Sequence, residues 1–475
     1  MMNLTRRRML SSLGAGAGAY ALSDTFWPAS AGAENLSADA LPLLIFCEFN
    51  GAWDTLLSLD PRDHTDSRFN DPAGSVYTGY ELVAEEDGAI EALMSNNNSG
   101  LVTPNGSNIS FGPAIGDLAS YFEDLCVLRG VNMGTLTHEV GRRYFLTGKF
   151  PRGLAASGSA MATFWVNDHT STTPIPNLVI RSETFNEGLD PKASGLKITG
   201  YQDLSKVLRS LNASLDPGAK GAAALAALQS DPSCLDRQLD VGGMTSAYRA
   251  SYEKALVFSE GTLWQHFNFM RNPPENSAIY DVYQAFGLNP ANPNSGNALA
   301  GPRGQAAIAA QALTNNIAQA VSIQLASGID HHDEDWATDH APALRDGFNA
   351  LASLISYLKT TLDSNGKPFW DRTTIMAVSD FARTPNINPR GGRDHHLSSA
   401  CLVAGRGIKG NQVIGGTTDN NYSGRPINMT TGAPDDITGQ ILRPPDIHRT
   451  VLHAAGLPYE HIANQDPVLV KAMLG

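Results

Sequence analysis

Cysteine is scarce in this chain, and the few present predict no disulfide framework. Four cysteines in 475 residues are too few for a disulfide-stabilised scaffold, and none belongs to a C-x-x-C pair. Cys47, Cys126 and Cys401 each lie in an apolar, strand-like run. Free cysteines in such surroundings are typically buried. We therefore expect these three to be buried free thiols.

Basic residues and long apolar runs are also in short supply. Lysine and arginine number 34 against 47 aspartates and glutamates, which gives a formal net charge of −13. Nucleic acids and anionic lipids are bound by basic patches, so this balance opposes both kinds of partner and suits a protein that concentrates divalent cations. A membrane-spanning helix needs about 18 or more consecutive apolar residues, and the mature chain offers no such run.

The first residues predict a twin-arginine export signal. Thr5-Arg6-Arg7-Arg8-Met9-Leu10 precedes a short apolar run rich in alanine and glycine, and small residues near position 33 fit a cleavage site. We expect a signal peptide at 1–33 and a mature domain at 34–475. The expected partner in export is the twin-arginine translocase, and the expected location is periplasmic or extracellular. This pathway carries folded proteins, which favours a protein that bears a cofactor.

Short apolar runs alternate with helical patterns along the rest of the chain. Buried strands are predicted at residues 41–49, 125–131, 177–181, 322–326, 373–378 and 400–404. Helices are predicted at 305–320, 343–362 and 446–455. This order predicts an α/β fold with a doubly wound, mostly parallel sheet. We expect one domain, with a largely helical insert at about 203–300 and a surface excursion without a core at 60–112.

Acidic and imidazole side chains follow the ends of several predicted strands. Sites in open α/β sheets collect at the carboxyl ends of the strands, and carboxylates and imidazoles are ligands of divalent metals. The candidate ligands are Asp54, Asp330, His332, Asp380, Asp394, His395 and His396. Two other interpretations stay open: the run at 330–335 could be a solvated acidic loop, and Asp380 could cap its turn and pair with Arg383.

Two short segments add candidates for catalysis and orientation. Thr137 and His138 lie where a turn enters a predicted helix, and they are the candidate catalytic residues. A hydroxyl at a helix N-terminus is well placed as a nucleophile, although it is also an ordinary cap. Adjacent residues of an extended segment point to opposite sides. We therefore expect one of His395 and His396 to face the site, and we choose His395.

Taken in order, these motifs resemble the DUF1501 family of twin-arginine-exported bacterial proteins, which is related to the alkaline phosphatase and sulfatase superfamily. The resemblance covers nearly all of the mature chain, and its most specific segments are Ser379-Asp380-Phe381-Ala382-Arg383-Thr384 and Arg393-Asp394-His395-His396. It implies an alkaline-phosphatase-like fold with one or two divalent metal ions, Zn, Mn, Ca or Mg. By position, it implies that Thr137 is the nucleophile and that the ligands are Asp54, Asp330, His332, Asp380 and His395.

The chain departs from the pattern at three positions. Phe381 stands where the superfamily usually has a ligand histidine, Asp380 where the family usually has glutamate, and Thr137 where it usually has serine. The chain also lacks the C-x-P-x-R and S-x-P-x-R motifs of type-I sulfatases. A single-metal or degenerate site is thus an alternative to a two-metal centre.

Two functions are compatible with these observations. The first is an exported metal-dependent hydrolase of phosphate or sulfate esters, acting on a small molecule or a polysaccharide. The second is a non-catalytic binding or structural protein on a degenerate hydrolase scaffold.

Overall fold

The computed structural model describes most of the chain, at residues 41–151, 158–169, 173–208, 263–292 and 299–475 and at the single positions 220 and 223. These residues belong to one unit, Leu36–Gly475. The predicted signal peptide lies outside the described residues, as does most of the predicted insert. Within the described part, no helix combines the length and apolar character that crossing a membrane requires.

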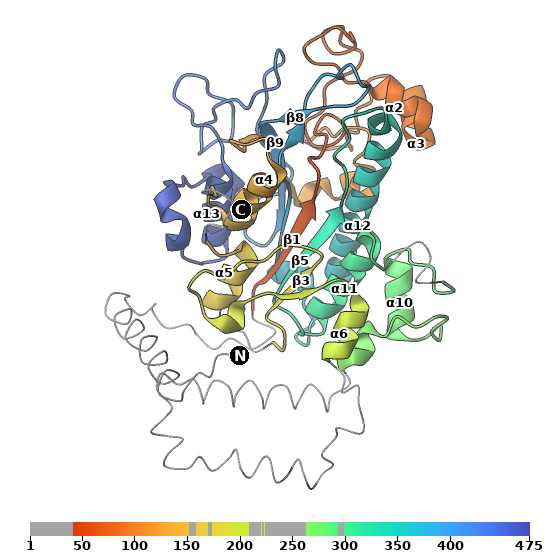
Figure 1. Ribbon diagram of the computed structural model, residues 1–475, viewed down its shortest axis with the longest axis vertical. Helices are drawn as coiled ribbons and strands as arrows, with labels where there is room; N and C mark the ends of the chain where they lie inside the picture. The colour runs from red at the N-terminus through yellow and green to blue at the C-terminus, as the bar shows by residue number, and fades with distance from the viewer. Residues whose placement is uncertain are drawn as a thin grey trace, which may run out of the picture. The chain divides into compact units, whose positions relative to one another are not determined.

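An eight-stranded sheet forms the centre of this unit (Figure 1). Its strands are β1 (Leu43–Phe49), β2 (Leu125–Asn132), β3 (Asn177–Ile180), β4 (Leu196–Ile198), β5 (Ala320–Ala326), β6 (Thr373–Ser379), β9 (Ser398–Gly405) and β10 (Gln412–Gly415). The strand order is β10-β2-β9-β6-β1-β5-β3-β4. Only β9 runs antiparallel to its two neighbours, β2 and β6. The predicted α/β class with a mostly parallel sheet is confirmed.

Helices cover both faces of the sheet, which explains why its central strands are apolar throughout. Leu44 and Phe46 of β1 belong to one buried cluster, whereas Ile45 and Cys47 belong to the other. One face carries α4 (His138–Thr147), α5 (Met161–Asp168) and α13 (Pro444–Ala454). The other carries α11 (Pro302–Thr314) and α12 (Ala341–Thr360), as Figure 1 shows.

Three cysteines lie in this core, as expected from their apolar surroundings. Cys47, Cys126 and Cys401 are buried and free, and burial raises the pKa of Cys126 to about 12. The fourth, Cys234, lies outside the described residues.

The remaining elements are short. The helices are α2 (Tyr80–Glu86), α3 (Gly88–Asn96), α6 (Tyr201–Val207) and α10 (Ala278–Ala285). The 3-10 helices are η2 (Gly116–Asp124), η3 (Pro191–Ala193), η6 (Leu263–Phe267), η9 (Phe369–Arg372), η10 (Glu460–Gln465) and η11 (Lys471–Met473), and η8 (Trp336–His340) is a π-helical turn. A separate two-stranded sheet pairs β7 (Ala382–Arg383) with β8 (His395–His396).

Two expectations about local structure were wrong. The segment 60–112 contains α2 and α3, and its apolar residues, among them Tyr80, Ile90 and Phe111, are buried in the main core. The segment is mostly polar, so its few, widely spaced apolar residues did not form a recognisable core pattern in the sequence. Helix α11 ends at Thr314 rather than near residue 320. Asn316 adopts a left-handed conformation, with a φ of 52°, which stops the helix before β5 begins.

Candidate metal centre

The candidate site lies at the carboxyl ends of parallel strands, where the loops that follow β2, β5 and β6 meet. His138 is the first residue of α4, which follows β2. Asp330 and His332 lie in the loop after β5, and Asp380 directly follows β6. His395 begins β8, where it pairs with Arg383 of β7. The topology thus brings together side chains that are up to 257 residues apart in sequence, as between His138 and His395.

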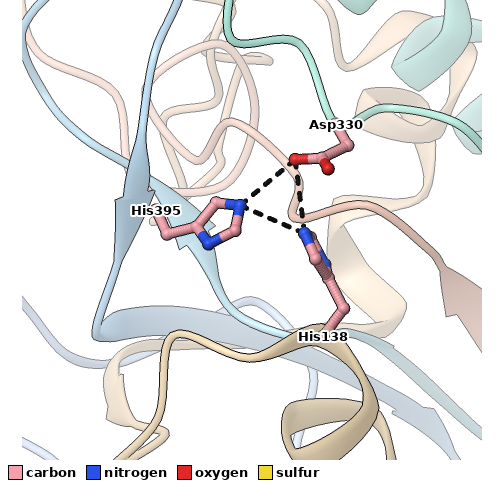
Figure 2. Close-up of side chains that lie close together, drawn as sticks. All are labelled: His138, Asp330 and His395. Carbon is pink, nitrogen blue, oxygen red and sulfur yellow. Dashed lines mark hydrogen bonds and ion pairs between the residues drawn. The ribbon is translucent and has the colours of Figure 1, made fainter.

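Three imidazoles and one carboxylate oxygen converge at this edge, and we call His138, Asp330, His332 and His395 the histidine–aspartate cluster. His395 Nε2 lies 3.1 Å from His138 Nε2 and 3.0 Å from His332 Nε2. Asp330 Oδ1 lies 3.3, 3.1 and 3.2 Å from the Nε2 atoms of His138, His332 and His395. Figure 2 shows three of these side chains pointing at one another.

Each histidine is held in one tautomer by an acceptor behind it. His138 Nδ1 donates to Asp380 Oδ2 at 2.5 Å, and His332 Nδ1 donates to Asp394 Oδ1 at 2.7 Å. The Nδ1 atom of His395 donates to the Leu136 carbonyl at 2.8 Å. A carbonyl and an ionised carboxylate can only accept, so each of these contacts is a hydrogen bond when Nδ1 carries the proton, and a neutral ring then turns its Nε2 lone pair toward the cluster. Histidine ligands of metals show this arrangement.

Converging lone pairs need a positive charge between them. Burial lowers the pKa of His138, but the hydrogen bond to Asp380 and the negative charges of Asp380 and Asp330 together outweigh it, and the pKa is raised. Burial lowers the pKa of His395. Burial acts to raise the pKa of Asp330, yet the hydrogen bond and charge of Arg383, together with His395 and His138, hold it well below its usual range. One carboxylate and inward-facing imidazoles therefore form a centre that is ready to receive a cation.

The donor set fits a divalent transition metal. Zinc takes imidazole and carboxylate ligands at about 2.0–2.2 Å in a tetrahedron, whose edges are then about 3.3–3.5 Å long. The separations of 3.1–3.3 Å among His138 Nε2, Asp330 Oδ1 and His395 Nε2 are close to three such edges. His332 Nε2 lies 3.1 Å from Asp330 Oδ1 and 3.0 Å from His395 Nε2, but it lies outside this mutually close group of three. Magnesium and calcium prefer oxygen ligands throughout. If a metal is bound, His138, Asp330 and His395 would hold it, with His332 beside them.

Two glycines allow the loops to approach one another closely enough to build the cluster. A Cβ atom on Gly141 of α4 would lie 2.1 Å from the Asp380 carbonyl oxygen. Gly51 has a φ of +117°, and a Cβ atom there would lie 2.8 Å from the Asp330 nitrogen. Side chains at either position would push the neighbouring loop away.

Three candidate residues from the sequence support the cluster or lie beside it. Asp380 is buried and accepts from His138 and from the amides of Gly51 and Ala52. It does not pair with Arg383, the alternative that the sequence left open. Asp394 accepts from His332. Thr137 is exposed at the start of α4, and its side chain makes no cap hydrogen bond.

Two other candidates lie apart from the cluster. The Asp54 carboxylate is buried, where it pairs with Arg393 at 3.2 Å and accepts from Trp336 Nε1 at 2.9 Å. His396 turns the other way from His395, and its Nε2 lies 3.3 Å from the Asn421 carbonyl. The Asp54 carboxylate is bonded to these two donors and is therefore not part of the cluster.

Sequence reasoning missed one group that shapes the site and considered the wrong partner for another. Asn388 Nδ2 donates to Asp394 Oδ1 at 3.1 Å, which fixes the acceptor behind His332. Arg383 is fully buried and contacts both Asp330 Oδ1 and His332 Nε2. Arg383 lies opposite His395 because the Ala-Arg strand β7 pairs with the His-His strand β8. No sequence pattern predicts that two strands of only two residues each will pair.

The fold and the cluster define an α/β protein with a candidate metal centre of histidine and aspartate side chains at its strand ends. The family described as "Protein of unknown function (DUF1501)" matches residues 42–466, and the chain belongs to this family. The recognition of the family from its motifs is therefore confirmed. No curated protein matches the chain.

Several solved structures match most of the chain at low identity. Ps i-CgsB in complex with k-i-k-neocarrahexaose is 10% identical, with a TM-score of 0.36, over 90% of this chain and 75% of its own. The PsFucS1 sulfatase from Pseudoalteromonas sp. is 12% identical, with a TM-score of 0.35, over 88% and 68%. TAB5 alkaline phosphatase, a His135Glu mutant with Mg bound in its M3 site, is 12% identical, with a TM-score of 0.29, over 88% and 99%.

Proposed function

We propose that this protein is a metal-dependent hydrolase of phosphate or sulfate esters. The observation that carries the proposal is the convergence of three Nε2 lone pairs on one Asp330 oxygen, each imidazole being oriented by its own acceptor. The cluster is solvent-accessible, since the Asp330 side chain is 45% exposed. The donor set favours zinc or manganese over magnesium or calcium.

A bound divalent cation would supply Lewis-acid chemistry, which stabilises negative charge on an ester oxygen. The chain supplies position and a nucleophile. Thr137 lies between Leu136, whose carbonyl accepts from His395, and His138, whose Nε2 contacts the same ring. Its exposed hydroxyl at the N-terminus of α4 would attack the phosphorus or sulfur atom. A threonine ester would form as the bond to the alcohol breaks, and the alcohol would leave with the proton of the Thr137 hydroxyl. Water would then hydrolyse the threonine ester, which releases phosphate or sulfate and restores Thr137.

The test is hydrolysis by the purified mature chain of aryl phosphate, aryl sulfate and phosphonate esters, with zinc or manganese added. We expect turnover of at least one class, and a Thr137→Val variant that loses turnover but keeps its metal. Thr135→Val is the matched control, since the Thr135 hydroxyl only accepts from the Thr137 amide. A native protein that holds its metal and releases no product from any of the esters would contradict the proposal.

A non-catalytic binding protein is the second candidate, and Phe381 favours it. The Phe381 ring lies 4.6 Å from the ring of His138 and 4.5 Å from that of His395, centroid to centroid. An apolar ring thus packs against the cluster where the superfamily usually has a ligand. If this candidate is correct, the folded protein will bind sulfated or phosphorylated saccharides but leave them intact.

We also propose that the protein is exported in its folded state by the twin-arginine translocase and acts outside the cytoplasm. The Arg6-Arg7 pair and the apolar run after it support this proposal. Cell fractionation should find the native protein in the periplasm or the medium. A variant with Arg6→Lys and Arg7→Lys should stay in the cytoplasm, and equal export of the two forms would contradict the proposal.

A further inference from the structure

Arg383 is a fully buried charge at the site, with a side chain that has no exposed surface. Its guanidinium donates to backbone carbonyls of three loops: Ala52 at 3.1 Å, Ile329 at 3.2 Å and Arg393 at 3.0 Å. It also contacts the Gly51 carbonyl. These acceptors carry only partial negative charge and do not neutralise the guanidinium. The positive charge of Arg383 therefore acts on the histidine–aspartate cluster.

The remaining contacts of Arg383 fall on two atoms of the histidine–aspartate cluster. Nη2 contacts Asp330 Oδ1, and Nη1 lies 3.3 Å from His332 Nε2. The Asp330 oxygen is also one of the groups that would hold a metal ion. A fixed guanidinium at this distance weakens that ligand toward a cation and repels any further positive charge.

The other buried carboxylates near the site have no capacity left for a second metal ion. Asp380 is saturated by His138 and by two backbone amides, and Asp54 is paired with Arg393. Among the residues that the structure describes, His138, Asp330 and His395 form the one group of three acidic, histidine or cysteine side chains that is arranged to hold an ion.

We infer that Arg383 takes the place of a second metal ion, so that the centre combines one divalent cation with one built-in guanidinium. This inference rests on the proposed metal site, but it does not depend on which ester is hydrolysed. Arg383 acts through Asp330 and His332, and it is a positioning and charge-setting residue.

The first test counts metal ions in the native protein. Chelator-stripped protein is titrated with Zn²⁺ by calorimetry and with Mn²⁺ under electron paramagnetic resonance. We expect one ion per chain at saturation and the spectrum of an isolated Mn²⁺ ion. Two ions per chain, an exchange-coupled Mn²⁺ pair, or no bound ion would each overturn the inference. Absence of ester hydrolysis with one bound ion would overturn only the proposed activity.

The second test asks whether the charge of Arg383 matters or only its packing. Arg383→Gln keeps a donor toward Asp330 but removes the charge, and we expect the Zn²⁺ dissociation constant to fall at least tenfold. Arg383→Lys keeps the charge and should stay within about threefold of native. Arg425→Gln, which removes an arginine paired with Asp436 instead, should bind like native. A folded Arg383→Gln protein with unchanged or weaker Zn²⁺ binding would overturn the role of the charge. If that variant does not fold, the count in the native protein still decides.

Discussion

Replacing Asp380 by asparagine should weaken metal binding without removing any ligand. Oδ1 of Asp380 accepts from the amides of Ala52 at 2.7 Å and Gly51 at 3.2 Å, and Oδ2 accepts from His138 Nδ1 at 2.5 Å. Asparagine has one side-chain oxygen, and this oxygen will accept from the backbone amides of Gly51 and Ala52. The side-chain NH2 group of the asparagine then faces His138 Nδ1. The imidazole must move its proton to Nε2, and the lone pair that points into the cluster is lost.

The magnitude follows from the role of the acceptor. Loss of a carboxylate that orients a histidine ligand typically costs 10–100-fold in metal affinity, which is about 1.4–2.8 kcal/mol. A misplaced buried amide costs roughly 1–3 kcal/mol of folding stability in addition. We therefore expect an Asp380→Asn protein that is folded but destabilised, with a Zn²⁺ dissociation constant raised 10–100-fold.

Competition with a chromophoric chelator measures the Zn²⁺ affinity. Thermal melts with and without metal then distinguish a loss of Zn²⁺ affinity from a loss of folding stability. Asp446→Asn is the matched control, because Asp446 is equally buried and accepts from the amides of Arg443 and Val468, outside the cluster. It should lose stability and keep its metal affinity. Equal Zn²⁺ affinity in Asp380→Asn and native protein would refute the assignment of tautomers.

The remaining predictions concern packing and pH. Gly141→Ala places a methyl group 2.1 Å from the Asp380 carbonyl and should cost about 1–3 kcal/mol and weaken Zn²⁺ binding, whereas Gly88→Ala, with open space around it, should do neither. Equal melting temperatures for the two variants would contradict this close approach. Burial lowers the pKa of His448 to about 4, and its neutral ring donates to the Phe145 carbonyl at 2.5 Å. Because the folded pKa lies below the unfolded value, this stability is complete above about pH 6.5 and is lost as the pH falls toward 4, by roughly 3 kcal/mol. Denaturant melts should show a flatter pH profile for His448→Gln, and parallel profiles would count against it.

The sequence predicted the sheet well because each central strand is a short apolar run buried on both faces. It predicted α12 and α13 because their apolar residues recur at helical spacing. It failed at two places where structure depends on more than the local pattern. Asn316 ends a helix through its backbone conformation, and the buried apolar residues of 60–112 are separated by many polar residues.

Part of the site was visible for the same kind of reason. Asp330, His332 and Asp380 follow strand ends, and strand order alone brings such positions together. The distinction between a group in the cluster and a group behind it was not visible, because it depends on hydrogen bonds across hundreds of residues. Asp54 and Arg393 illustrate this, because the residues next to each of them in the sequence do not predict that the two are buried as an ion pair.

Metal analysis of protein purified without chelator tests the central claim most directly, by comparing the native chain with His395→Ala. The account predicts about one equivalent of a divalent transition metal in the native protein, and less than about a tenth of that in the variant, with His396→Ala retaining the native content. Native protein without metal, or a His395→Ala variant that keeps its full equivalent, would contradict the account.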